Sequence, residues 1–165
     1  MKNFIYTFIL LLFFTSNSFS AGSSGGDSSD ASNKISNYKK AHNLIKSAKK
    51  YEKKGKTEKA QKRYAKAQKL LLKSNKENPL QADTLNYLGF TTRKLGDYEK
   101  GEQFYLQGLK IDPKHNGINE YLGELYVATN RINLAKERLK VLEKCECEEF
   151  TELKEIIEGT KKSKY

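Results

Sequence analysis

A self-match at a spacing of 34 residues constrains this chain of 165 residues more than any other feature. The tripeptide Tyr87-Leu88-Gly89 recurs as Tyr121-Leu122-Gly123. Around the first copy, residues 82–113 carry large apolar side chains at three- and four-residue steps, on both sides of a turn at residues 95–98. This pattern predicts two short amphipathic helices. A repeat of this length is typical of stacked helix–turn–helix units, so it predicts an all-α fold.

Three glycines, Gly89, Gly101 and Gly108, fall inside the two predicted helices. A glycine within a helix costs about 1 kcal/mol relative to alanine, so it needs a packing reason. We therefore expect a neighbouring helix to approach closely at these positions.

Two weaker copies flank the central one. The first keeps the small and tyrosine positions of the second helix, at Gly55, Ala60, Tyr64 and Ala67. Its spacing to the central copy is seven residues longer, which equals two helical turns and predicts an extended second helix. In the third copy Asn130 replaces the turn glycine, an exchange that is tolerated because asparagine also enters the left-handed region.

These motifs resemble the tetratricopeptide repeat family, and the chain resembles an exported bacterial member of it. The resemblance implies an all-α, right-handed superhelix of antiparallel helix pairs. We expect about three repeats within a domain spanning residues 34–160, at residues 41–81, 82–115 and 116–147. A capping helix at residues 148–160 is expected to cover the apolar face that the last repeat otherwise exposes. Residues 161–165 form a basic tail, which we expect to be frayed.

The amino-terminal 20 residues have the composition of a secretory signal peptide. Lys2 precedes an apolar core from Phe4 to Phe14, and Ser18 and Ser20 provide small side chains before Ala21. Eleven apolar residues are too few to cross about 30 Å of hydrocarbon. We expect a cleaved signal and a periplasmic or secreted protein; an uncleaved anchor is the alternative. Residues 21–33, rich in glycine and serine, are expected to form a disordered linker.

The net charge of +11 is unevenly distributed. Residues 34–80 hold 16 lysine or arginine residues and three acids, whereas residues 81–165 hold 14 and 15. A basic segment can be a solvated face or can attract an acidic protein or an acidic lipid surface. Only Arg63 in that segment is arginine, which argues against nucleic acid because phosphate and guanine contacts favour arginine.

The two cysteines, Cys145 and Cys147, lie where the last repeat meets the capping helix. In an exported protein they would tend to form a local structural disulfide. A bridge across two residues is difficult within a helix, so free or intermolecular thiols, or a redox-active or soft-metal pair, remain alternatives. His42 and His115 have no metal-ligand spacing to the cysteines, so no metal site is expected. We expect a surface or packing role for both histidines.

No catalytic motif is recognisable. The sequence has no nucleophile elbow, phosphate-binding loop, zinc-protease motif or paired carboxylates at a usable position. We therefore expect no enzyme activity and no cofactor.

The family resemblance implies that the first helix of each repeat lines a concave binding groove. Phe90 is the strongest candidate there, because Leu88 and Gly89 already serve the packing side. The positions of the carboxylate clamp of some relatives hold only one basic residue, Lys49, and no asparagine. This departs from the clamp pattern. The expected groove residues are Lys46, Lys49, Lys53, Asn86, Tyr87, Phe90, Arg93, Lys94, Glu120, Tyr121 and Glu124.

Together these features predict a non-catalytic scaffold that binds a protein or peptide partner in its groove. One alternative is a binder of an anionic surface, acidic lipid or acidic protein, through the lysine-rich first repeat. A second is a thiol-redox or soft-metal role for the two cysteines. The sequence predicts neither the partner nor the oligomeric state.

Overall fold

A computed structural model describes residues 36–163, and these residues form seven α-helices. The expected signal peptide (1–20), the linker (21–33) and the last two residues of the basic tail lie outside the described residues. No helix within residues 36–163 combines the length and apolar character needed to cross a membrane. The helices are α1 (Asn37–Lys53), α2 (Thr57–Glu77), α3 (Ala82–Lys94), α4 (Tyr98–Ile111), α5 (Asn116–Ala128), α6 (Ile132–Leu142) and α7 (Glu148–Ile157).

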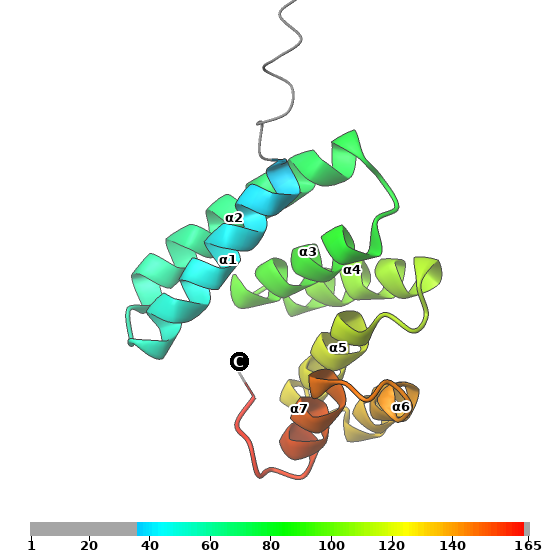
Figure 1. The fold of residues 1–165 in the computed structure, drawn as a ribbon. Helices are drawn as coiled ribbons and strands as arrows, with labels where there is room; N and C mark the ends of the chain where they lie inside the picture. Colours follow the sequence, from blue (N-terminus) through cyan, green and yellow to red (C-terminus); the bar gives the residue numbers. More distant parts are fainter. Residues whose placement is uncertain (1–35, 164–165) are drawn as a thin grey trace, which may run out of the picture. The chain divides into compact units, whose positions relative to one another are not determined.

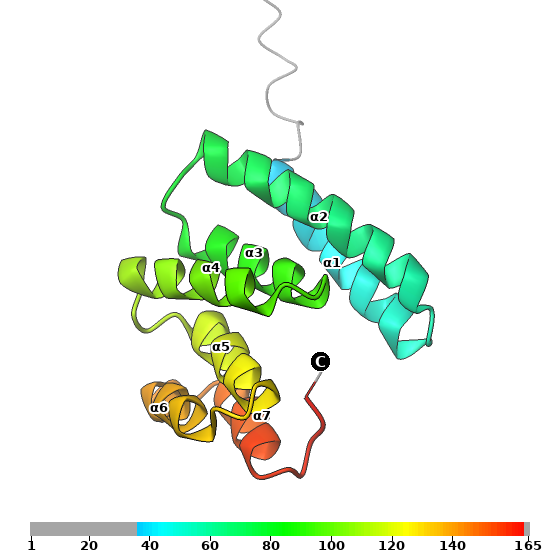
Figure 2. The same ribbon diagram turned by 180° about the vertical axis from the view of Figure 1, so that it is seen from behind.

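The first six helices form three antiparallel pairs, and α7 follows as a single helix (Figure 1). Helix α1 packs on α2, α3 on α4, and α5 on α6. Successive pairs stack through α2 on α3 and α4 on α5, while α7 packs against α5 and α6. The view from behind shows the same order of pairs (Figure 2). The described residues contain no strand, and the predicted all-α fold of stacked helix pairs is confirmed.

Helix lengths and turns agree with the spacing in the sequence. Helix α2 has 21 residues against 14 in α4, so the extension predicted for the first pair is present. The turns within the three pairs each contain one residue with positive φ: Gly55 at 67°, Gly96 at 97° and Asn130 at 58°. The predicted left-handed backbone at Asn130 is confirmed, and it lets the third pair turn without glycine.

The repeated Tyr-Leu-Gly motif marks places where another side chain fills the space of a missing Cβ. A Cβ on Gly89 would lie 2.5 Å from Cε1 of Tyr105 in α4. A Cβ on Gly123 would lie 2.5 Å from Cδ2 of Leu153 in α7. Tyr105 and Leu153 are both fully buried. The close approach predicted at Gly89 is confirmed, and Gly123 allows the same close approach of Leu153 in α7.

Candidate functional site

The central helix α3 is buried on nearly all sides, with nine of its 13 residues buried. This changes the surface that was expected from the sequence. Although some of them still line the clefts described below, five of the eleven expected groove residues are buried. They are Asn86, Phe90, Arg93, Glu120 and Glu124.

Helix α3 packs mainly on α4 and α2, and the Lys49 side chain of α1 also reaches Tyr121 in α5. Lys49 Nζ in α1 donates a hydrogen bond to the Tyr121 hydroxyl in α5 over 3.0 Å. Phe90 lies beneath this bridge, with Lys49 Nζ 4.6 Å from its ring centre and the Tyr121 ring centre at 5.0 Å. On its other side the Tyr64 ring centre is 5.7 Å away. Phe90 is therefore 1% exposed and belongs to the core.

Arg93 is the centre of a buried polar network. Its Nη1 donates to the Tyr121 carbonyl oxygen over 2.6 Å, and its Nη2 lies 3.3 Å from Glu124 Oε2. The side chains of Arg93 and Glu124 are both fully inaccessible. Carboxylate oxygens of Glu120, Glu124 and Glu152 lie within 4.8 Å of one another. Two cations offset this negative charge. Arg93 pairs with Glu124, and Lys161 pairs with Glu152.

The bridge from Lys49 to Tyr121 leaves one cleft on each side. The cleft on the Lys49 side, here called the lysine cleft, has a volume of about 540 Å³. Lys94 Nζ pairs with Glu52 Oε1 there at 2.6 Å. Phe90 is almost fully buried, and it forms part of the floor of this cleft. The lining residues are Lys49, Glu52, Lys53, Phe90, Lys94, Glu152 and Ser163.

The cleft on the Tyr121 side, here called the acidic cleft, has a volume of about 460 Å³. It is bordered by α3, the α4–α5 loop, the start of α5 and α7. A smaller hollow of about 220 Å³ adjoins it at Glu120 and Glu149, with Glu148 and Glu152 on its wall. The residues lining the acidic cleft are Asp83, Asn86, Tyr87, Asp112, Lys114, His115, Asn116, Gly117, Glu120, Tyr121 and Glu149.

A cluster of partly exposed aromatic rings borders the acidic cleft. The Tyr87 ring centre lies 5.4 Å from that of His42 and 6.0 Å from that of Tyr38. Burial raises the pKa of the Tyr87 hydroxyl, and the charges of Asp83 and Glu120 raise it further. Burial and the same Asp83 carboxylate also raise the pKa of Tyr38. Both phenols are therefore neutral at physiological pH and can donate hydrogen bonds.

The acidic side of this site was found only in part from the sequence. Glu120 was among the expected groove residues, whereas Glu149, in the first turn of α7, was not, although it lines the acidic cleft. Lys161, the first residue of the expected basic tail, pairs with Glu152 at 3.2 Å and with Glu155 at 3.4 Å. Lys46, another of the expected groove residues, lines neither cleft and is exposed.

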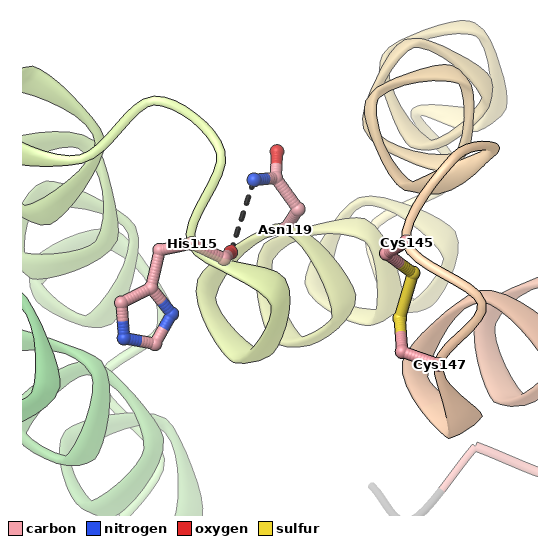
Figure 3. Close-up of a disulfide and its surroundings, with 4 residues drawn as sticks. All are labelled: His115, Asn119, Cys145 and Cys147. Carbon is pink, nitrogen blue, oxygen red and sulfur yellow. Dashed lines mark hydrogen bonds between the residues drawn. A yellow bond between two sulfur atoms is a disulfide. The ribbon is translucent and has the colours of Figure 1, made fainter.

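Cys145 and Cys147 are joined by a disulfide in the loop between α6 and α7, with Cα atoms 5.2 Å apart (Figure 3). His115 lies apart from them at the start of α5. Its Nδ1 accepts from the Ile118 N–H over 3.2 Å, and its Nε2 is 3.2 Å from Asp83 Oδ1. The Nδ1 contact makes His115 the N-cap of α5. The His115 carbonyl oxygen also accepts a hydrogen bond from Asn119 Nδ2.

The chain is similar in fold to solved structures of other proteins. No curated protein sequence matches the chain. The Yersinia enterocolitica type III secretion translocator chaperone SycD is 18% identical, with a TM-score of 0.52, over 77% of this chain and 86% of that chain. The first and second tetratricopeptide regions of Spaghetti (RPAP3), each bound to an HSP90 peptide, are 21% and 18% identical. Their TM-scores are 0.47 and 0.41. They cover 74% and 64% of this chain, and 94% and 92% of their own chains.

The family match falls on the central helix pair. Residues 82–115, which comprise α3, α4 and the loop after them, match the tetratricopeptide repeat family. The glycine contacts, the left-handed turn residue and the stacking on both sides agree with this assignment. Residues 82–115 therefore match a tetratricopeptide repeat and lie within an all-α stack of helix pairs.

Proposed function

We propose that this chain is a non-catalytic protein-interaction module that binds a segment of a partner protein on the face formed by α1, α3 and α5. The observation that carries the proposal is the half-exposed ring cluster of Tyr38, His42 and Tyr87 beside the acidic cleft. Aromatic side chains beside a cleft supply much of the binding energy of protein interfaces. Within residues 36–163, the open surface of this face includes the ring cluster and both clefts.

A photo-crosslinking amino acid at His42 tests this proposal in the native cell. We expect it to capture a partner that can be identified by mass spectrometry, whereas the same amino acid at Tyr98 captures none. Tyr98 is a suitable control because it is an exposed tyrosine position on α4, outside the face in question. The purified partner should bind Tyr87→Ala at least about tenfold more weakly than the unmodified chain. Equal affinity for both would place the binding surface elsewhere.

A second candidate function, binding of an anionic surface, is favoured by one pocket between α1 and α2. Four cations surround its apolar floor of Leu44 and Tyr51, and Arg63 stacks on the Tyr51 ring at 4.9 Å. Residues 36–80 hold 15 lysine or arginine residues and only three acids. The four cations are Lys59, Lys62, Arg63 and Lys66.

Vesicles rich in phosphatidylglycerol and soluble polyglutamate test this candidate by co-sedimentation and fluorescence anisotropy. Binding should weaken steeply between low and moderate salt, because exposed charges are screened within about 10 Å at 0.1 M salt. Charge reversal by Arg63→Glu with Lys59→Glu should abolish binding to the vesicles and to polyglutamate. Lys110→Glu on α4 changes one charge away from this pocket and should weaken the binding only slightly. Binding that is indifferent to salt would rule the candidate out.

A further inference from the structure

The acidic cleft has more carboxylates than cationic side chains in its lining. Four acids line it, and two more carboxylates, of Glu148 and Glu152, line the adjoining hollow. Against them stand Lys114 and His115, and the His115 ring is already engaged by Ile118 N–H and Asp83. The first turn of α5 also borders the cleft, but His115 caps it. The four acids are Asp83, Asp112, Glu120 and Glu149.

Asn86 adds an observation that is independent of the charges. Its side chain is 5% exposed and lines the cleft. Among the described residues, its Oδ1 has no hydrogen-bond partner. A buried acceptor without a partner destabilises a protein unless a bound group or water donates to it. A ligand or a water in the cleft would supply the donor that this oxygen lacks.

Two tyrosine rings complete the environment. Tyr87 and Tyr121 both line the cleft, and burial, together with the charge of Glu120, raises the pKa of both hydroxyls. Aromatic faces attract ammonium and guanidinium groups. Carboxylates, an amide oxygen and aromatic rings are together the surroundings that an organic cation requires, and they repel an anion.

We propose that the acidic cleft receives a lysine or arginine side chain of the bound partner segment. The proposal rests on the proposed function and specifies the chemistry of the partner. The cation would lie between Glu149 and Glu120, donate a hydrogen bond to Asn86 Oδ1, and contact the ring of Tyr87, because the Tyr121 ring already faces Lys49 and Arg93. The neighbouring ring cluster of Tyr38, His42 and Tyr87 would hold the adjacent part of the segment.

A random peptide library displayed on phage and selected on the purified full chain tests this inference. We expect lysine or arginine to be enriched at one fixed position of the selected sequences. Calorimetry with a synthetic consensus peptide then measures the affinities for a double-mutant cycle between peptide and chain. Replacing its basic residue by norleucine, which keeps the hydrocarbon chain and removes the charge, should weaken binding at least about tenfold.

Glu149→Gln should weaken the basic peptide about three- to tenfold and leave the norleucine peptide within about twofold. Glu99→Gln, the same change at an exposed position of α4, should leave both affinities unchanged. Peptides that depend on Tyr87 but show no basic position would overturn this inference and leave the proposed function standing. A selection that yields no peptide dependent on Tyr87 would overturn both. Self-association that Glu149→Gln abolishes would assign the cleft to a second copy of the chain and overturn the inference.

Discussion

Arg93→Ala is expected to lower the free energy of unfolding by about 3–5 kcal/mol. The substitution leaves Glu124, whose side chain is fully buried, without its guanidinium partner 3.3 Å away. It also removes the donor to the Tyr121 carbonyl oxygen, so the link between α3 and α5 is lost. Removing one member of a buried ion pair is far more costly than removing a surface charge, because the remaining charge stays desolvated. Urea denaturation followed by circular dichroism measures the change.

The double variant Arg93→Met with Glu124→Leu separates the ion pair from the packing around it. It replaces both charges by apolar side chains of similar volume, so it should be markedly more stable than Arg93→Ala. Lys100→Ala, at an exposed position of α4, provides a control for loss of a positive charge and should change stability by less than about 0.5 kcal/mol. A loss of less than about 1 kcal/mol in Arg93→Ala would contradict the central role of this pair.

The burial of Arg93 and Phe90 also determines which variants can report on binding. A variant at either position disturbs the contacts of α3 with α1, α2 or α5, so lost binding would reflect lost structure. Tyr87 and Glu149 are only partly buried and line the acidic cleft. Variants at these two positions therefore test the proposed surface with less disturbance of the fold.

The helix pairs and their turns could be predicted because each depends on local patterns. A helical period, a left-handed turn residue such as Asn130 and a glycine opposite a large ring all leave a signal within about 20 residues of sequence. Gly89 is an example, since its cost within a helix indicated the close approach that Tyr105 in fact makes. The family resemblance added the order in which the pairs stack.

The exposed surface could not be predicted in the same way. Periodicity assigns one buried face to a helix, whereas α3 is covered by neighbours on several sides. Phe90 was thus placed in an open groove because nothing in the sequence indicates that Lys49 spans α3 to reach Tyr121. Glu149 joins Asp83 and Glu120 in one cleft only because α7 folds back against α5. Both arrangements join elements far apart in the chain, so they depend on how the helix pairs stack.

The second large effect is expected where α7 covers the last helix pair. Leu153→Ala should lower the free energy of unfolding by about 2–5 kcal/mol, because the leucine is fully buried against Gly123 and leaves a cavity when truncated. In a stack of repeats each unit is stabilised by its neighbours, so the loss should fall first on α5, α6 and α7. Hydrogen exchange should rise in these helices before it rises in α1 and α2. Uniform acceleration along the chain would instead indicate a single cooperative unit.

Gly123→Ala tests the same contact from the other side. In the unmodified chain the added Cβ would lie 2.5 Å from Leu153 Cδ2, so the leucine must shift, and this offsets the gain of about 1 kcal/mol in helix propensity. In the Leu153→Ala background that methyl group is gone, and the added Cβ fills part of the cavity. Gly123→Ala should therefore be more favourable there by at least about 1 kcal/mol, measured as a coupling energy in a double-mutant cycle. Equal effects in the two backgrounds would mean that Gly123 is not what holds α7 in place. The position of α7, and with it Glu149 at the acidic cleft, would then need another cause.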